Sequence, residues 1–271
     1  MVKPDLETRF GAAPDGPMDM ATMWRRLASC GSVRSFSEKP VDPAMIETLA
    51  ALALCSPTKS DLQQRDIIII RDPDQRTAIH ACLDDQTWVA KAPELLVFCG
   101  NNRRQRRIHE LRGRNFANDH LDALFNPAVD AGIALSAFVL AAEEAGLGCC
   151  PVSAIRNKPE DVSRILALPD HVFPVAGLAV GWPEEPASVS FRLPLSQTVH
   201  IDRFSDDGFD EALADYDTRR EAAQPYAKQR FSDEYGEDTS YPWSEDKARQ
   251  YSKPERSTFG AFIRAIGFKF D

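Results

Sequence analysis

The chain of 271 residues lacks an excess of positive charge and lacks a hydrophobic run long enough to cross a membrane. Its 32 lysines and arginines are outnumbered by 41 aspartates and glutamates, whereas nucleic-acid-binding domains usually carry the opposite balance. The longest apolar run, Ala131 to Ala142, has twelve residues, against the roughly 20 that a transmembrane helix needs. Residues 1–15 carry three acids against two cations and no apolar stretch, whereas a secretory signal has a positively charged segment followed by a hydrophobic one. We therefore expect a cytoplasmic protein that binds neither nucleic acid nor membrane.

The common signatures of metal sites and of nucleophilic catalysis are also missing. The six cysteines show no C-x-x-C spacing and the five histidines no H-E-x-x-H pattern, so no metal site is indicated. There is no G-x-S-x-G, no phosphate-binding P-loop and no complete G-x-G-x-x-G. Cysteines used in this way are typical of buried thiols in a reducing compartment. The local motifs thus name no catalytic side chain.

The composition is typical of a globular protein, with 43% hydrophobic and 27% charged residues. Asp42-Pro43 and Asp72-Pro73 each place a capping residue before a proline, which predicts two helix starts. Residues 127–145 predict a long helix that is apolar on nearly all sides and therefore buried in a core or an oligomer interface. Short apolar runs predict strands at residues 67–70, 94–99, 149–154 and 173–181. Alternating helices and strands favour an α+β or α/β sandwich.

Composition divides the chain into three regions. Residues 1–19, which are rich in proline, glycine and alanine, predict a flexible N-terminal extension, and residues 20–200 carry the alternating elements. Residues 201–250 hold 14 acids against 7 cations, so we expect the segment 201–271 to wrap the main body or a partner subunit. Within the middle region, residues 103–114 carry six arginines and one acid. Such a run is typical of a solvated helix face, and an anion-binding patch is the alternative.

Several weak motifs become informative through their order along the chain. Gly31-Ser32-Val33-Arg34-Ser35-Phe36 precedes Ser56-Pro57-Thr58-Lys59-Ser60-Asp61, and Gln86 follows. Then come Gly-Leu-Gly at 146–148, Ile-Arg-Asn at 155–157, Gly-Trp-Pro at 181–183 and Arg-Leu-Pro at 192–194. Over roughly residues 20 to 271 this series resembles the FMN-dependent nitroreductase family, in its oxygen-insensitive NAD(P)H nitroreductase and flavin reductase branch.

The resemblance implies a three-layer α/β/α sandwich of the α+β class, in a domain-entwined homodimer with FMN at the subunit interface. A member of this family passes hydride from NADH or NADPH through the flavin to a small electron-poor acceptor, such as a nitroaromatic, a quinone or a flavin, in a ping-pong cycle. The flavin itself carries this chemistry, which agrees with the lack of a catalytic side-chain motif. The apolar helix expected at residues 127–145 suits a subunit interface.

The family motifs also imply which residues of this chain bind the cofactor. Arg34 matches the cation beside flavin N1 and O2, Gln86 matches an amide at the pyrimidine edge, and Arg192 matches a phosphate-binding arginine. Arg230 matches an arginine of the loop that holds the electron donor. The other implied FMN contacts are Cys30, Gly31, Ser32, Thr58, Lys59, Ser60, Gln63, Pro151, Val152, Ser153, Ala154 and Ser190.

The chain departs from the family pattern at the phosphate and donor sites. Cys30-Gly31 and Ser190 stand where relatives usually carry cations, and Ser153-Ala154 replaces the usual Gly-Gly. Four acids follow Arg230, namely Asp233, Glu234, Glu237 and Asp238. These acids would repel the 2′-phosphate of NADPH, so we expect near-equal use of both donors or a modest preference for NADH. The alternatives are a flavin-binding sensor or storage dimer without turnover, a specialised flavin reductase and a reductive dehalogenase.

Overall fold

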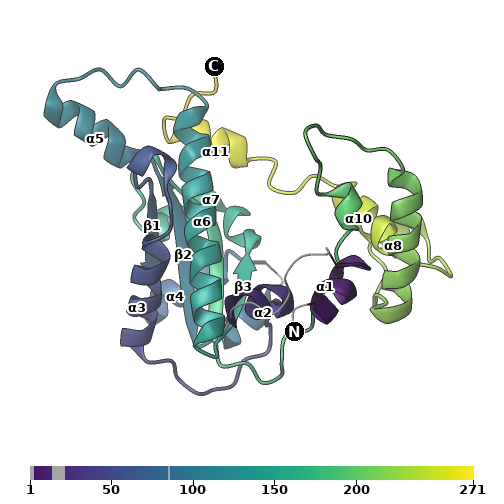
Figure 1. The fold of residues 1–271 in the computed structure, drawn as a ribbon. Coiled ribbons are helices and arrows are strands. Elements are labelled where there is room, and N and C mark those ends of the chain that lie inside the picture. Colours follow the sequence, from purple (N-terminus) through teal and green to yellow (C-terminus); the bar gives the residue numbers. More distant parts are fainter. Residues whose placement is uncertain (1–2, 14–21, 85) are drawn as a thin grey trace. The chain divides into compact units, whose positions relative to one another are not determined.

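The computed structural model describes residues 3–13, 22–84 and 86–271, which fall into two compact units (Figure 1). The sheet unit comprises residues 31–187 and 256–271, and the helical unit comprises residues 1–30 and 188–255. These limits differ from the division at residues 19 and 200 that composition suggested. The C-terminal residues belong to the sheet unit because Phe262, Ile263 and Phe268 pack with Phe173 in one buried cluster.

The sheet unit is built on four antiparallel strands in the order β1-β2-β4-β3. Their bounds are β1 Arg65–Ile69, β2 Glu94–Asn101, β3 Gly148–Val152 and β4 Val172–Gly181. Each of the four predicted strands is therefore present. A β-bulge between Phe98 and Cys99 shifts the register of β2 against β4.

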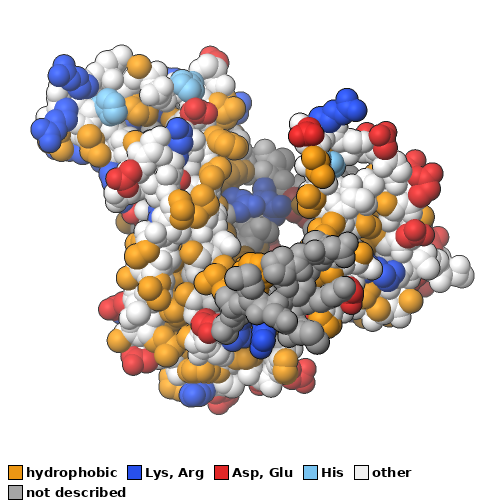
Figure 2. Space-filling view, in the orientation of Figure 1, with side chains coloured by type: hydrophobic (Ala, Val, Ile, Leu, Met, Phe, Trp, Pro, Cys, Tyr) orange, Lys and Arg blue, Asp and Glu red, His pale blue; other side chains and the backbone are white. Residues whose placement is uncertain are grey.

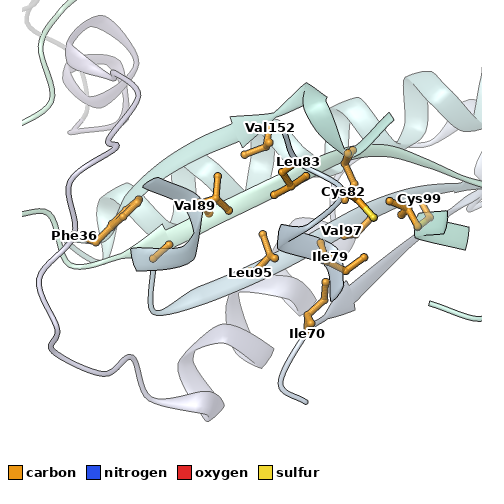
Figure 3. Packing of buried hydrophobic residues seen from close by; sticks show 14 of the residues in the cluster. Phe36, Ile70, Ile79, Cys82, Leu83, Val89, Leu95, Val97, Cys99 and Val152 are labelled. Carbon is orange, nitrogen blue, oxygen red and sulfur yellow. The ribbon is translucent and has the colours of Figure 1, made fainter. Parts of the chain in front are cut away.

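Alternating side chains of β2 supply two hydrophobic cores, one on each face of the sheet. Leu95, Val97 and Cys99 belong to the first core, which includes residues of α4 (Pro73–His80) and α7 (Pro159–Ile165) (Figure 3). The intervening Leu96 and Phe98 belong to the second core, with α3 (Pro43–Leu54) and α6 (Asp122–Glu144). Because a strand points successive side chains to opposite faces, this alternation places the sheet between two helical layers. The three-layer sandwich of the α+β class is confirmed.

The capping aspartates act as their positions predicted. Asp42 accepts a hydrogen bond from the backbone N–H of Ala44 at 2.9 Å, and Asp72 accepts one from Gln75 at 2.8 Å. Each bond satisfies one of the free donors at the start of a helix. The remaining helical segments of the sheet unit are α5 (Arg103–Arg112), α11 (Phe259–Ala265) and the short 3₁₀ turns η1 (Lys59–Asp61), η2 (Thr87–Lys91) and η3 (Ser153–Arg156).

Helix α6 begins earlier than the apolar pattern predicted and includes Pro127. By length and composition alone it could cross a membrane, but one stripe of its side chains is buried in the second core. Other apolar side chains of this helix stay open, with Phe125 60% and Val129 41% exposed. Hydrophobic side chains are visible on the surface along α3 and α6 in Figure 2. The sequence predicted burial on nearly all sides of this helix, but in the single chain only one face of α6 is buried.

The helical unit contains α1 (Lys3–Phe10), α2 (Thr22–Ser29), α8 (Phe209–Ala223), α9 (Ser232–Tyr235), α10 (Trp243–Tyr251) and the 3₁₀ turn η4 (Leu195–Gln197). Helix α1 lies within the segment 1–19 that was expected to be flexible, whereas residues 14–21 lie outside the described residues. Arg9 of α1 is only 4% exposed, and its Nε donates to the carbonyl of Ala28 at 2.5 Å. This contact joins α1 to α2.

Candidate functional site

The loop of residues 58–63, implied to contact the flavin, precedes β1 and has a constrained backbone. Ser60 and Gln63 have φ values of 48° and 53°, a conformation that costs energy for residues other than glycine. Lys59 Nζ donates to Ser60 Oγ at 3.0 Å, and the backbone N–H of Gln63 donates to Thr58 Oγ1 at 3.4 Å. The structure therefore brings these four implied contacts together in one strained loop.

Asp130 of α6, which no motif singled out, anchors this loop. Its side chain is fully buried, and its two carboxylate oxygens accept hydrogen bonds from the backbone N–H groups of Lys59 at 2.9 Å and Gln64 at 3.2 Å. Arg65, only 5% exposed, donates to three carbonyl groups within residues 54–57 at 2.6–2.9 Å. Burial lowers the pKa of this guanidinium and the charge of Asp130 raises it. A lone acid inside an apolar helix is the sequence signal that could have identified Asp130.

Trp88 connects two of the implied flavin contacts. Its indole Nε1 donates to the side-chain oxygen of Gln86 at 2.9 Å, and the Arg34 guanidinium lies 5.9 Å from the centre of its ring. A cation at this distance is attracted by the negative face of an indole. Arg34 and Gln86 are both exposed, and Trp88 is half-buried. Sequence reasoning assigned no role to Trp88.

The segment that carries Ser32 and Arg34 runs beside β3. The backbone N–H of Val33 donates to the carbonyl of Cys149 at 2.9 Å, which keeps the exposed side chains on either side of Val33 close to this strand. Both side chains act on the neighbouring thiol of Cys150. Burial raises the pKa of that thiol, while the charge of Arg34 and a hydrogen bond with Ser32 oppose the increase. The implied contacts Ser32 and Arg34 therefore meet at one buried cysteine.

Strand β3 leads into the stretch implied to approach flavin N5 and O4. Pro151 and Val152 end the strand, and Ser153 and Ala154 begin the turn η3. Val152 is buried in the first core, whereas Pro151 and Ser153 are exposed. The hydroxyl of Ser153 has no hydrogen-bond partner within the described part of the chain. Gly31, the remaining implied contact of this unit, is half-buried.

Three further implied contacts lie in the helical unit, where Arg9 links them. Arg9 donates from its guanidinium to the carbonyl of Cys30, and its own carbonyl accepts from the backbone N–H of Arg192 at 2.7 Å. The Arg192 guanidinium donates to Ser190 Oγ at 2.6 Å and to the carbonyl of Phe191 at 3.1 Å. Arg9 had been expected in a flexible extension, so its role here was missed.

Arg230 of the implied donor loop is held within the helical unit. Its Nε donates to Asp246 Oδ1 at 3.1 Å, and its backbone N–H donates to the hydroxyl of Tyr241 at 2.9 Å. The Asp246 side chain is 2% exposed. Burial would raise the pKa of Asp246, but the charges of Lys247 and Arg230 bring it below its ordinary value. The orientation of Arg230 is thus determined by a buried carboxylate.

Two of the four acids that follow Arg230 have cation partners of their own. Glu234 pairs with Lys253 at 2.6 Å, and Asp238 pairs with Arg249. The hydrogen bond from Lys253 lowers the pKa of Glu234. Such pairs cancel part of the negative field that was expected to repel the 2′-phosphate of NADPH.

The cations implied to bind the cofactor are not neutralised by a carboxylate in the described part of the chain. Arg34, Lys59 and Arg192 form no ion pair with any carboxylate among the described residues, whereas Arg106 and Arg230 each do. A dianionic phosphate and a reduced flavin ring both need nearby positive charge. The residues present therefore fit FMN.

Comparison with known proteins agrees with this chemistry. The model of the nitroreductase family matches residues 28–182, and the model of the nitroreductase C-terminal domain matches residues 191–271. An FMN reductase [NAD(P)H] of Bacillus subtilis is 28% identical over 91% of this chain and 98% of its own length. An oxygen-insensitive NADPH nitroreductase of Salmonella typhimurium is 35% identical over 69% of this chain and 80% of its own.

The fold comparison points the same way. The solved structure of NfrA2 from B. megaterium superposes with a TM-score of 0.84 at 29% identity, covering 93% of this chain and all of its own. This chain belongs to the nitroreductase family.

Proposed function

We propose that this protein is an NAD(P)H-dependent flavin oxidoreductase that binds FMN noncovalently and reduces a small electron-poor acceptor, such as a nitroaromatic, a quinone or a flavin. The observation that carries the proposal is the match to an FMN reductase along nearly the whole of both chains. When bound, FMN would supply the hydride transfer between the reduced nicotinamide and the acceptor. The protein therefore has to bind and orient the cofactor and its two substrates, and needs no reactive side chain of its own.

The residues of the chain divide these tasks. Arg34, positioned by Trp88, stabilises negative charge on the flavin ring, and the Gln86 amide offers donors and acceptors to its polar edge. Arg192, oriented by Ser190, binds the phosphate. Arg9 supplies a cation beside Cys30, one of the positions where relatives usually carry one, and its guanidinium lies 3.8 Å from the Cys30 sulfur.

The visible spectrum of the purified protein tests this function. We expect oxidised-flavin bands that bleach when NADH or NADPH is added and return with a quinone or nitroarene. Because two acids near Arg230 are already paired, near-equal use of the two donors is expected in the same titration. An FMN-loaded protein that no donor bleaches would instead support the sensor or storage alternative, and a protein unable to take up FMN would contradict the proposal.

The protein is also proposed to be a homodimer of the cytoplasm. All six cysteines are free thiols, as in a reducing compartment. On α3 and α6 a row of apolar side chains stays exposed, including Leu52 at 53% and Phe125 at 60%. Burial in a second copy would remove this apolar surface from water.

We expect light scattering to give twice the monomer mass of 30.1 kDa. Phe125→Glu should shift the mass toward the monomer, because a charge at an apolar interface is costly to desolvate. Ile201→Glu is the matched control, since Ile201 is 84% exposed and lies outside α3 and α6. A monomeric parent with flavin bound would contradict the dimer.

A further inference from the structure

A cavity lined by arginines lies beside α5, apart from the residues assigned to the flavin or its electron donor. Its volume is about 400 Å³, within the usual range for small-ligand pockets of roughly 300–1,000 Å³. Arg103, Arg106 and Arg107 line it from α5, and Arg114 lines it from the following loop. Figure 2 shows Lys and Arg side chains gathered over this helix.

Two of these four guanidinium groups are available to a ligand. Those of Arg103 and Arg114 form no hydrogen bond or ion pair with any residue that the structure describes, and both residues are exposed. Arg107 pairs with Glu110 at 2.9 Å, but the two side chains are 68% and 65% exposed. An ion pair so open to water contributes little and exchanges readily for a stronger anion.

The fourth arginine stiffens the wall of the cavity. Arg106 pairs with Asp119, which also binds Lys269 at 2.6 Å, and the Arg106 hydrogen bond lowers the pKa of Asp119 to about 2. The guanidinium of Arg106 lies 4.7 Å from the centre of the Phe116 ring. His109 meets that ring edge-on at 5.1 Å. The wall is therefore held in place before any ligand arrives, which reduces the entropic cost of binding.

A second cavity, of about 280 Å³, shares the His109–Phe116 pair with the first. Lys59 and Ser60 of the implied flavin loop also line it. A ligand anchored among the arginines could therefore extend its organic part past Phe116 toward that loop.

We propose that the arginine cavity binds the phosphomonoester dianion of a small molecule. The planar fork of a guanidinium matches two phosphate oxygens at once, and a dianion can engage Arg103 and Arg114 together. The lining contains two acids, Glu110, which pairs with Arg107, and Asp170. The unpaired guanidinium groups of Arg103 and Arg114 therefore outnumber the one remaining carboxylate, that of Asp170. The chain as a whole carries a net charge of −9, which disfavours a long polyanion and favours a compact one.

Two sources could supply this phosphate, namely the 2′-phosphate of NADPH or a separate phosphorylated metabolite. An assignment to the 2′-phosphate of NADPH rests on the proposed function, whereas an assignment to a separate metabolite does not. Calorimetric titration of the full chain with inorganic phosphate and with 2′,5′-ADP tests the site without requiring turnover. Flavin content is measured separately from the spectrum, so a failure of the proposed function is recognised independently.

The decisive variant is the double substitution Arg103→Ala/Arg114→Ala, with Arg112→Ala as its control. Arg112 lies on the same helix and is exposed, but it does not line the cavity. We expect the double variant to bind 2′,5′-ADP at least about tenfold more weakly, since it loses two charge-assisted contacts, and to show a shallower salt dependence. Arg112→Ala should bind like the parent.

The kinetics of the two donors identify the source. A KM that rises for NADPH but not for NADH in the double variant assigns the site to the 2′-phosphate of the donor. Weaker phosphate binding with both KM values unchanged assigns it to a separate metabolite. Equal phosphate affinity in the parent and the double variant, or an equal loss in Arg112→Ala, would overturn the proposal.

Discussion

Replacing Arg192 with alanine is expected to weaken FMN binding by about 1.5–3 kcal/mol, the usual loss for a hydrogen bond to a charged group. This corresponds to a dissociation constant raised roughly 10- to 150-fold. The expectation follows from the structure as well as from the family motif. The Arg192 guanidinium has no carboxylate partner among the described residues, and Ser190 orients it at 2.6 Å. A cation held in this way is ready for a phosphate.

The measurement is a fluorescence titration of apoprotein with FMN, together with the flavin retained through gel filtration. Arg203→Ala serves as the control, because it removes an exposed arginine from the same unit without touching a proposed contact. Arg192→Lys keeps the charge but not the fork, so we expect an intermediate affinity. If Arg192→Ala keeps its flavin as well as the parent does, the phosphate assignment is wrong.

The second large effect is expected at Asp130. Replacing it with alanine leaves the part-buried N–H group of Lys59 and the buried N–H group of Gln64 without acceptors, and an unsatisfied buried donor costs about 1–3 kcal/mol. We therefore expect the free energy of unfolding to fall by about 2–5 kcal/mol, with lower FMN affinity because the 58–63 loop loses its anchor. Asp130→Asn keeps one side-chain carbonyl as acceptor and should lose less.

Urea unfolding measures the stability, and limited trypsin cleavage after Lys59 reports on the loop itself. Asp122→Ala is the control on the same helix, since Asp122 is exposed in its first turn. Faster cleavage after Lys59 in Asp130→Asn, under conditions where the fold persists, would locate the effect in the loop. If Asp130→Ala unfolds at the same urea concentration as Asp122→Ala, the anchoring role is refuted.

Much of this fold could be predicted from the sequence because it depends on interactions between residues that are close along the chain. The helix starts at Pro43 and Pro73 depend on an aspartate and a proline within one turn, so neighbouring residues suffice to predict them. The strands followed from short apolar runs because both faces of the sheet are covered. The ordered series of motifs identified the family, and the family implied the FMN contacts.

The sequence alone could not determine contacts that join distant parts of the chain. Asp130 meets Lys59 across 71 positions, and Arg9 meets Cys30 across 21, because the chain path brings them together. The exposure of one face of α6 could not be predicted either, since an apolar pattern shows which side chains avoid water but not what covers them. The arginines of α5 looked alike in the sequence. Only tertiary packing separates Arg106, neutralised by Asp119, from Arg103, whose guanidinium pairs with no acid among the described residues and is left for a ligand.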